Sequence, residues 1–535
     1  MQEAIRYLIE NYARNISSRD ELEAAKRAVC KRFGLKSIIN ADILSVGRNL
    51  GWPQPGDKGQ ALFLKLLRKR SIRTLSGIAP VAVLTKPYPC PGRCAYCPHE
   101  PDVPVSYLSN EPAVMRAIRC GYDPYIQVIM RLKALEANGH EPNKIEIIVI
   151  GGTWSYLPEK YKYWYILNCF RAANDFKIQR KKLLAEGSQS PKSPYKQSLS
   201  LEVLKRKLRT DQKKNENAAY RIIGLTLETR PDYLNEAEAR QMRELGCTRV
   251  EIGVQAIDDK ILAKNRRGHG IKEIAEATAK LKHFGFKVTY HFMPALPGSS
   301  PTKDLAMFKA LFSDESFQPD QIKFYPTVVT KGSLLYQWYK QKKYRPYSDK
   351  VLQRLIAGCK AVVPRYVRII RLVRDIPGES IIAGNKITNL RQVMKDQGVS
   401  CQCIRCREAK DTPIGNYALS VVNYPASGGR EYFISADSRN RKILYGFCRL
   451  RLDVSSPIAP ALIRELHVYG ELRPVGSSAL IQHSGLGKKL LAKAEAIARQ
   501  AGAEKIAVIS GVGVRGYYRK LGYVLRGSYM YKTLT

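Results

Sequence analysis

The sequence predicts an α/β protein with two domains of different topology behind a basic helical segment. Strand-like and helix-like stretches alternate from Ile78 to about Glu379, which is typical of repeated βα units and a parallel sheet, open or closed into a partial barrel. From about Gly415 the pattern changes to antiparallel strands, followed by a glycine-rich turn and a helix. Apolar residues near the N-terminus recur at helical spacing. We therefore divide the chain into 1–75, a barrel domain at 76–385, a linker at 386–414 and a second α/β domain at 415–535.

Charge and composition indicate which classes of partner the chain can bind. It has 535 residues, and 44% of them are hydrophobic, as in a globular protein with several cores. Its 89 Lys and Arg against 47 Asp and Glu leave a net charge of +42, more than solubility requires, so we expect a polyanionic partner. Nucleic acid is the first candidate and an anionic membrane surface is the second. The 12 unevenly placed cysteines indicate a reducing cytoplasm rather than a disulfide framework.

Targeting and membrane-spanning segments are not expected. The first residues carry acids and lack the apolar core of a signal peptide. Apolar runs such as Ile145–Ile150 are far too short to span a bilayer.

The N-terminal segment predicts helices with a basic surface. Ile5, Leu8, Ile9 and Tyr12 share one helical face, and Ser18 is placed to cap a second helix. The segment holds 15 Lys and Arg against 7 Asp and Glu. Such a face is either solvated surface or a site of phosphate contact.

The barrel domain supplies six strand-like runs with helices between them. The predicted strands are Val81–Thr85, Lys144–Ile150, Ile222–Thr226, Arg249–Gly253, Lys287–Phe292 and Gln321–Tyr325. The predicted helices include Pro112–Ile118, Ile126–Asn138, Asn235–Glu244, Ile271–His283 and Thr302–Leu311. Ligands of such sheets bind beyond the carboxyl ends of the strands, so residues there are the site candidates.

Three cysteines follow the first of these strands. Cys90, Cys94 and Cys97 have the spacing C-x3-C-x2-C, with Tyr96 before the last. A structural zinc or an all-cysteine iron–sulfur cluster needs four protein ligands, so three thiolates on a [4Fe–4S] cluster would leave one iron open. The motif resembles that of the radical S-adenosylmethionine (SAM) enzymes, in which SAM binds the open iron and is cleaved to a deoxyadenosyl radical. A zinc knuckle with a remote fourth ligand is the alternative.

Polar residues and glycines end the later strands. Two adjacent glycines would let a backbone approach a ligand closely. Glu228 and Arg230 after the third strand could pair with the charged ends of SAM. Glu251 and Gln255 of the fourth strand could hold a ribose hydroxyl or the adenine edge. For each residue alone, a satisfied hydrogen bond at a sheet end is the alternative. The candidates are Gly151, Gly152, Glu228, Arg230, Glu251, Gln255 and, on the sixth strand, Lys323.

An insertion interrupts the barrel. Residues Glu186–Leu201 are rich in Ser, Pro and Lys, and Lys205–Asn217 is a basic run. Both predict a mobile or partly disordered loop. It could gate the site or contact nucleic acid, or be a solvated surface insertion.

The linker carries the second cysteine group. Cys401, Cys403 and Cys406 lie within six residues and could supply three ligands of a structural zinc that braces the domain junction. No fourth ligand is evident nearby. Free thiols in a linker are the alternative.

The last domain contains a phosphate-binding pattern. Q-x-x-G-x-G lies before a helix, where backbone N–H groups can face an anion. With the strand before it and the segment YYRKLGY after it, this pattern resembles the GNAT acetyltransferases. The resemblance implies that coenzyme A phosphates bind the glycine loop and that pantetheine pairs with a splayed strand. It also implies that Tyr517 or Tyr518 lies near the thioester sulfur as an acid; core packing is the alternative for each. The implied acetyl-CoA residues are Glu465, Leu466, His467, Val468, Gln482, Gly485, Leu486, Gly487, Lys488 and Tyr518.

The combination of both domains resembles the family of Elongator catalytic subunits. It rests on TLETRPD (226–232), CTRVEIGVQA (247–256), RELHVYG (464–470) and ISGVGVRGYYRKLGY (509–523), and it covers about residues 80–535. The resemblance implies conversion of the wobble uridine, position 34, of tRNA to 5-carboxymethyluridine. A SAM-derived radical would take hydrogen from the acetyl-CoA methyl group, the carbon radical would add to uridine C5, and water would cleave the thioester. It also implies a role near acetyl-CoA for Lys144, which precedes the second barrel strand.

The same resemblance implies the partners. They are the anticodon stem-loop of tRNA and an electron-donor protein, with no membrane. A prokaryotic member would need no other Elongator subunits, and a homodimer is left open. Two other functions remain: a protein lysine acetyltransferase with a structural iron–sulfur domain, and a basic RNA-binding module with vestigial cofactor sites.

Overall fold

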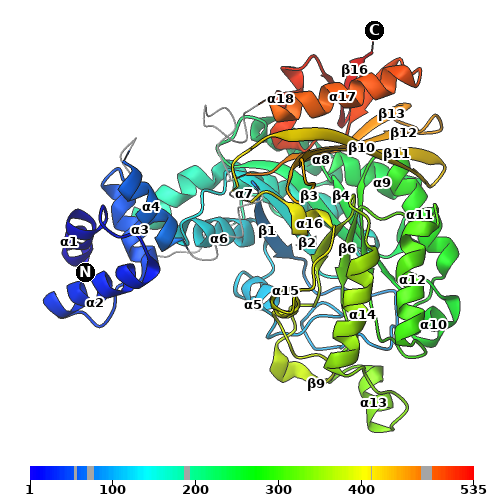
Figure 1. Cartoon of the computed structure of the whole chain (residues 1–535), viewed down its shortest axis with the longest axis horizontal. Helices are drawn as coiled ribbons and strands as arrows, with labels where there is room; N and C mark the ends of the chain where they lie inside the picture. Colours follow the sequence, from blue (N-terminus) through cyan, green and yellow to red (C-terminus); the bar gives the residue numbers. More distant parts are fainter. Residues whose placement is uncertain (53–56, 69–76, 186–192, 411, 471–484, 535) are drawn as a thin grey trace.

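The computed structural model describes the chain except residues 53–56, 69–76, 186–192, 411, 471–484 and 535. Three parts follow one another: a group of N-terminal helices, a parallel sheet with its helices, and a C-terminal sheet that lies against the parallel one (Figure 1). Within the described residues, no helix combines the length and the apolar character that crossing a bilayer requires.

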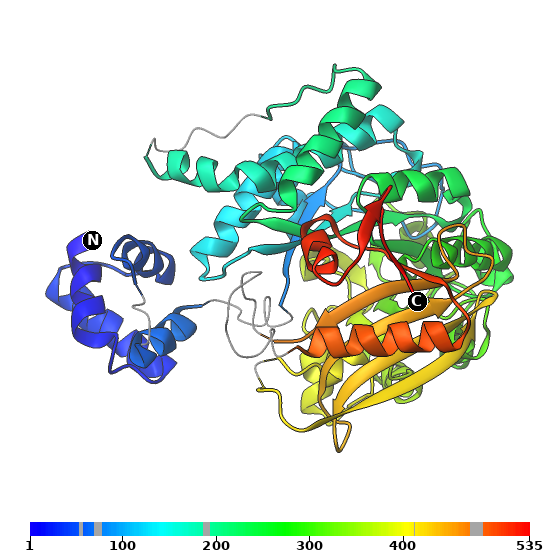
Figure 2. The same ribbon diagram turned by 90° about the horizontal axis from the view of Figure 1, so that it is seen from above.

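The N-terminal helices form a unit with its own core. Ser18 caps the second helix by accepting a hydrogen bond from the Glu21 N–H, as predicted. The buried residues of this unit form a cluster separate from the main core. The unit lies apart from the rest of the molecule in Figure 2 and meets it at α6, where Arg68 Nε donates to the Gly139 carbonyl at 3.1 Å. The helices are α1 (Gln2–Tyr12), α2 (Arg19–Arg32), α3 (Asn40–Asn49) and α4 (Lys58–Leu67).

The middle part is a seven-stranded, entirely parallel sheet in sequential order. Because its first and last strands do not pair with each other, the sheet is an open half-barrel. The apolar and β-branched residues predicted as strands form its buried core. The strands are β1 (Ala79–Leu84), β2 (Lys144–Ile150), β3 (Arg221–Thr229), β4 (Arg249–Gln255), β5 (Lys287–Phe292), β6 (Gln321–Phe324) and β8 (Arg368–Arg371).

Helices and short connections surround the half-barrel. The helices are α5 (Pro112–Arg119), α6 (Pro124–Ala137), α7 (Glu159–Ala185), α8 (Leu201–Asn215), α9 (Glu236–Glu244), α10 (Asp259–Lys264), α11 (Ile271–His283), α12 (Pro301–Ser313), α13 (Leu334–Lys340) and α14 (Asp349–Val362). Short 3-10 turns are η2 (Trp154–Tyr156), η3 (Pro231–Tyr233) and η4 (Gly378–Ser380). A small ribbon pairs β7 (Val329–Thr330) with β9 (Ile381–Ala383).

The prediction of a loop over Lys205–Asn217 is wrong for most of its length. These residues belong mainly to α8, which Ser200 caps and which buries Leu204 and Leu208 against the core. The basic residues between these two leucines concealed the i, i+4 spacing. Of the predicted loop 186–201, residues 186–192 lie outside the described part of the chain.

The C-terminal part is a seven-stranded, mostly antiparallel sheet with α17 lying across one face (Figure 2). Its order is β10-β11-β12-β13-β14-β16-β15. The strands are β10 (Tyr417–Ala426), β11 (Gly429–Ser438), β12 (Leu444–Leu452), β13 (Ala461–Val468), β14 (Lys505–Val508), β15 (Val524–Arg526) and β16 (Tyr529–Thr533). Its helices are α17 (Leu486–Gln500), α18 (Arg515–Arg519) and the turn η5 (Val512–Val514); α15 (Leu390–Asp396) and α16 (Ile404–Arg407) precede it.

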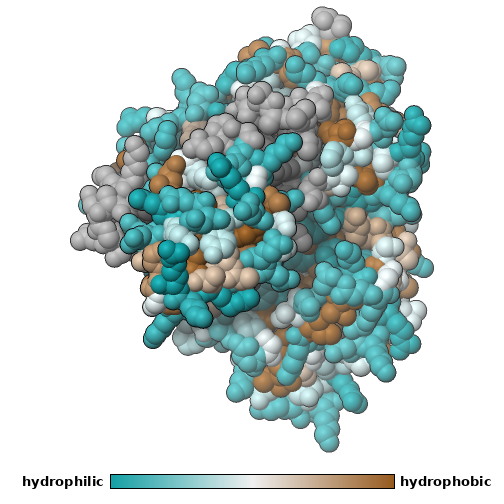
Figure 3. Space-filling view, turned by 60° about the vertical axis from the view of Figure 1, so that its left-hand side comes forward, coloured by the Kyte–Doolittle hydropathy of each residue, from teal (hydrophilic) through white to brown (hydrophobic). Residues whose placement is uncertain are grey.

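The two sheets are joined by buried ion pairs and by direct backbone packing. Arg464 of β13 pairs with Asp320, the residue before β6, and both side chains are fully buried. At η5, a Cβ added to Gly511 would lie 1.9 Å from the Ile223 carbonyl oxygen of β3. The C-terminal domain therefore rests on the backbone of the half-barrel. The outer face beside the N-terminal helices is mostly hydrophilic (Figure 3).

Candidate active site

One cavity of about 1230 Å³ runs through the half-barrel. At one end it is lined by the three cysteines that follow β1, and at the other by Glu465, His467 and Tyr469 of the C-terminal domain. The cysteine loop and two residues of the predicted acetyl-CoA site, Glu465 and His467, thus line the same space.

The cysteine loop is enclosed by cations. Cys94 is buried, and its Sγ accepts hydrogen bonds from Arg267 Nη1 at 3.2 Å and Arg230 Nη1 at 3.8 Å. A hydrogen bond with Cys97 and the charge of Arg267 lower the pKa of Cys94, so this sulfur carries thiolate character. Arg230 also pairs with Asp232 at 2.7 Å. Arg230, one of the residues predicted to bind SAM, therefore reaches the cysteine loop.

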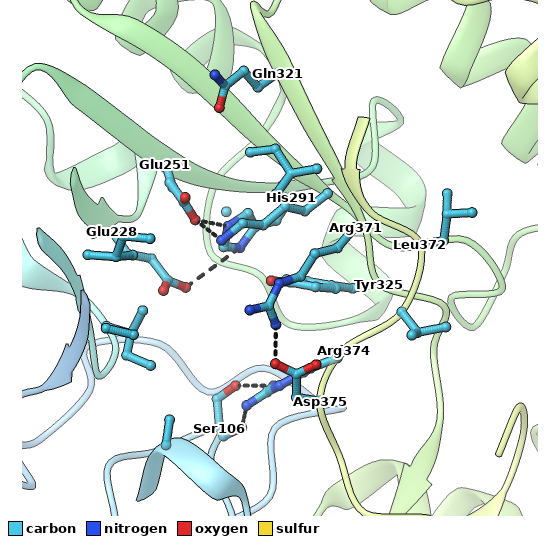
Figure 4. Close-up of a pocket in the computed structure, with 18 of the residues that line it drawn as sticks. Ser106, Glu228, Glu251, His291, Gln321, Tyr325, Arg371, Leu372, Arg374 and Asp375 are labelled. Carbon is cyan, nitrogen blue, oxygen red and sulfur yellow. Dashed lines mark hydrogen bonds and ion pairs between the residues drawn. The ribbon is translucent and has the colours of Figure 1, made fainter. Parts of the chain in front are cut away.

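The predicted carboxylates lie on adjacent strands above this loop. Glu228 and Glu251 turn toward His291 in Figure 4. The His291 ring contacts Glu251 through Nε2 at 2.8 Å and Glu228 through Nδ1 at 3.6 Å, and Lys323 donates to Glu251. Although burial raises the pKa of Glu251, the charges of Lys323 and His291 lower it well below its usual value, so the group is an anion.

The atoms without partners fit a polar ligand here. Glu251 Oε1 and Gln255 Oε1 are buried acceptors with no hydrogen-bond donor among the described residues. Gln255 has a φ of +70°, an uncommon conformation for a residue with a side chain. Buried acceptors beside a three-cysteine loop fit the amino and hydroxyl donors of SAM, with the cluster on Cys90, Cys94 and Cys97.

Steric crowding explains why a glycine follows β2. Gly151 has a φ of +131°, and a Cβ there would lie 2.2 Å from Thr85 Oγ1. Gly152, at +108°, lines the cavity. Only the second glycine lines the cavity; the first allows β1 and β2 to end side by side.

At the opposite end, β13 separates from β14 while it stays paired with β12. It pairs with β14 only over Ala461–Ile463, so among the described residues the rest of the strand has no strand partner on that side. Glu465 and His467 point into the cavity, while Leu466 and Val468 alternate to the other face. A free strand edge at this position matches the predicted pantetheine site.

The helix that begins beside this edge has an open N-terminus. Gly485 caps α17 with a φ of +79° and has no side chain to cap the first N–H groups, so within the described part of the chain those of Leu486, Gly487 and Lys488 can face an anion. These residues fit the diphosphate of coenzyme A. Gln482 lies outside the described residues.

The two tyrosines occupy different environments. Tyr518 is 6% exposed and packs against Tyr523 in the core. Tyr517 is half-buried, and a Cβ at Gly487 would lie 2.9 Å from its hydroxyl. Burial raises the pKa of Tyr517 to about 12, so it is protonated at neutral pH and can donate a proton. Tyr517 is the tyrosine that faces the α17 N-terminus.

Lys144 lies at the start of β2, paired in register with Arg221. Burial, with the charge of Arg221, lowers its pKa to about 8. Arg221 in turn packs against Gly513 of η5, so Lys144 lies near the C-terminal domain rather than near the cysteine loop.

The sulfurs of Cys401, Cys403 and Cys406 lie within 4.8 Å of one another. Among the described residues, this is the one group of three or more potential ligands close enough to share an ion. Ile404 and Arg405, between these cysteines, line the cavity. The geometry fits three ligands of one zinc ion and adds no fourth from the described chain.

Several residues of this site were not among the predicted ligands. Lys287 and Arg449 hold Glu465 at 3.5 and 3.0 Å, and Arg267 contacts Cys94. His291 ends a strand as the predicted carboxylates do, so the same rule would have found it. Arg267 follows α10 in a connecting loop, where no local pattern marks it.

Comparison with protein families matches both domains. Residues 88–309 match the Radical SAM superfamily, residues 319–397 the Radical_SAM C-terminal domain, and residues 419–523 the acetyltransferase (GNAT) family.

Comparison with individual proteins matches nearly the whole chain. The tRNA uridine(34) acetyltransferase of Dehalococcoides mccartyi is 43% identical over 87% of this chain and 100% of its own length. Human Elongator complex protein 3 is 38% identical over 88% and 87%. The chain belongs to the Elongator complex protein 3 family. An N-terminally truncated Elp3 of the archaeon Methanocaldococcus infernus shares the fold, with a TM-score of 0.71 and 36% identity over 86% of this chain and all of that one.

Membership of the Elp3 family confirms the predicted pairing of a radical SAM half-barrel with a GNAT domain. The radical SAM family implies a [4Fe–4S] cluster and SAM, and the GNAT family implies acetyl-CoA. The named relatives include both archaeal and bacterial proteins, which fits a prokaryotic member.

Proposed function

We propose that this chain modifies uridine 34 of tRNA and that its product is 5-carboxymethyluridine, made from acetyl-CoA with SAM as the radical source. The continuous cavity carries this proposal, because Glu465 and His467 of the GNAT strand β13 and the cysteine loop line one space. A relative with 43% identity is named for acetyl transfer to this nucleotide. A carboxymethyl product requires a new carbon–carbon bond, which a carbon radical can form. Acetyl transfer alone would not need a radical SAM domain.

The residues of the cysteine end would bind and orient the radical source. Cys90, Cys94 and Cys97 would hold the cluster, which when bound supplies the single electron for SAM cleavage. The free acceptors of Glu251 and Gln255 would hold SAM beside it. Lys323 and His291 keep Glu251 ionised, so its oxygen remains an acceptor for a ligand cation.

The GNAT end would hold acetyl-CoA with its acyl group toward the cavity. The N–H groups at the start of α17 would bind the diphosphate, and the free edge of β13 would pair with pantetheine. Tyr517, held protonated by burial, would give a proton to the leaving thiolate sulfur.

The charge of the molecule supports a tRNA substrate. The net charge of +42 favours phosphate binding, and the exposed N-terminal helices add a basic surface beside the half-barrel. A wobble base in a single-stranded loop can leave its stack and enter a pocket, as sequence-specific RNA recognition often requires. We place this activity in the cytoplasm, with an electron-donor protein supplying the reductant.

We also propose that Cys401, Cys403 and Cys406 bind a structural zinc. Because Ile404 and Arg405 between these ligands line the cavity, the ion would shape the cavity wall as well as brace the linker. We therefore expect loss of the zinc ion to lower the free energy of unfolding more than it lowers activity.

Acetyl-CoA hydrolysis with and without tRNA tests the proposed function. We expect tRNA to stimulate thiol release, and we expect Tyr517→Phe to reduce the stimulated rate about 100-fold. Tyr518→Phe is the matched control, because the Tyr518 ring lies in the core. The stimulated rate of this variant per folded protein should stay within about threefold of the wild-type rate. A tRNA with an altered anticodon loop should not stimulate.

A second measurement separates this function from lysine acetylation. Anaerobic reactions with reductant, SAM, acetyl-CoA and tRNA should yield carboxymethyluridine by mass spectrometry of nucleosides. Acetyl groups on protein lysines, with no tRNA stimulation and no modified uridine, would instead support a lysine acetyltransferase and would refute the proposal.

A further inference from the structure

Two arginine side chains converge on one cysteine of the cluster loop. Arg267 Nη1 lies 3.2 Å from Cys94 Sγ, and Arg230 Nη1 lies 3.8 Å from the same sulfur. All three residues are at least 94% buried, with exposed fractions of 6%, 5% and 6% for Arg267, Arg230 and Cys94. Water therefore does little to screen these contacts.

The two guanidinium groups differ in how their charge is balanced. Arg230 has a carboxylate partner, Asp232, and also donates to the Arg267 carbonyl. Arg267 donates to the Gly253 carbonyl at 2.6 Å and to Cys94, and within the described chain no carboxylate pairs with it. Its Nε has no hydrogen-bond partner among the residues that the structure describes. The cysteine sulfur is thus the anion that faces the Arg267 charge.

The backbone makes room for both groups. A Cβ at Gly92 would lie 2.3 Å from Arg230 Nη1, and a Cβ at Gly253 would lie 2.5 Å from Arg267 Nη2. Gly92 belongs to the cysteine loop and Gly253 to β4, so two separate elements lack a side chain where an arginine passes. Such an arrangement holds the two groups against the sulfur in a fixed position.

We propose that Arg267, supported by Arg230, is a positioning residue that makes the cluster on Cys90, Cys94 and Cys97 easier to reduce. This rests on the proposed function, which places a [4Fe–4S] cluster there. Three thiolates and a 2+ core give a net charge of −1, and uptake of one electron makes it −2. The electron would come from a low-potential one-electron donor, an iron–sulfur or flavin protein in the cell. A buried cation stabilises the −2 form more than the −1 form, so it raises the reduction potential.

The same interaction distinguishes the three cysteines. Cys94 receives two charged donors, whereas Cys90 receives the Gly92 N–H at 3.4 Å. We expect the added electron density to be drawn toward the iron bound by Cys94.

A potentiometric titration of the reconstituted full-length protein tests this inference. Titanium(III) citrate would serve as reductant, and the electron paramagnetic resonance signal of the reduced cluster would be followed. We expect Arg267→Gln to lower the equilibrium constant for reduction at least tenfold, which is about 59 mV for one electron. Arg267→Lys, which keeps the charge but loses the fixed fork, should fall between this variant and wild type.

Arg266→Gln is the matched control. Arg266 is adjacent and exposed; the arginines that contact Cys94 in the described chain are Arg230 and Arg267, and replacement of Arg266 removes the same formal charge. Its potential should equal that of the wild type. Iron content per chain and circular dichroism would verify that each variant is folded and loaded.

Two results would overturn the inference. The first is an unchanged potential in fully loaded Arg267→Gln, or in Arg267→Lys if the glutamine variant does not hold iron. The second is an equal shift in Arg266→Gln, which would indicate only a general effect of protein charge. A wild-type protein that binds no reducible cluster would instead refute the proposed function, so the two failures are distinguishable.

Discussion

The two cysteine triplets have the same number of thiols but different surroundings. Cys90, Cys94 and Cys97 follow a barrel strand, and Cys94 is buried beneath two arginines. Cys401, Cys403 and Cys406 lie in a linker, bring their sulfurs within 4.8 Å, and include an exposed member. The first arrangement suits a cluster with several irons and the second a single ion. The environment of the thiols, more than their number, predicts the chemistry.

Replacing a ligand of the first triplet should have the largest effect. We expect Cys94→Ser to lower carboxymethyluridine formation below about 1% of wild type, because loss of one thiolate removes the site of SAM cleavage. Nucleoside mass spectrometry measures this product. Cys120→Ser, which alters a half-buried cysteine that belongs to neither group, should retain full product formation. Wild-type product levels in the Cys94 variant would contradict the radical function of this triplet.

The second triplet should affect stability. Cys403→Ser should lower the free energy of unfolding by about 4 kcal/mol, since Cys403 is buried and loss of a structural metal is among the largest single effects. Denaturant titration and zinc analysis measure it. Product formation per folded molecule should remain within a fewfold of wild type. An unchanged stability together with absent zinc would show that these thiols bind no ion.

A smaller effect is expected where the second triplet meets the cavity. Glu408 pairs with Arg368 at 2.8 Å, and Arg368 donates to the Tyr469 hydroxyl at 2.9 Å. Glu408→Gln should remove about 1 kcal/mol of interaction with Arg368 at the cavity wall. This loss corresponds to about a fivefold rise in the KM for acetyl-CoA, and we expect kcat to be unchanged. A fall in kcat instead would place Glu408 in the chemistry rather than in the wall.

A further effect concerns the acid stability of the contact between the domains. Burial raises the pKa of Glu465, but the charges of Lys287 and Arg449 outweigh it and lower the pKa to about 2. The stabilisation is therefore complete above the unfolded carboxyl pKa of about 4.3 and is lost as the pH falls toward 2. The difference in Tm between wild type and Glu465→Gln should shrink across this range. A constant difference would indicate that Glu465 is not charged in the folded protein.

Local patterns predicted the parts of the site that lie at strand ends. Glu228, Glu251 and Lys323 were found because parallel strands bring their carboxyl ends to one edge. The contact of Arg267 with Cys94 joins residues 173 positions apart through the packing of a loop, which no periodicity records. Helix α8 was missed because its charge obscured two buried leucines, Leu204 and Leu208. Tyr517 and Tyr518 could not be separated without the helix that turns one outward.

The glycine contact between the domains limits how this protein can evolve. At Gly511 even a methyl group would meet the Ile223 carbonyl, and at Gly513 it would lie 2.6 Å from the Arg221 Cβ. An acetyltransferase domain from another protein, with any other residue at these positions, would not seat on this half-barrel. Exchange of one domain by recombination would therefore leave a cavity with one working end. We therefore expect the two domains to be inherited as a pair.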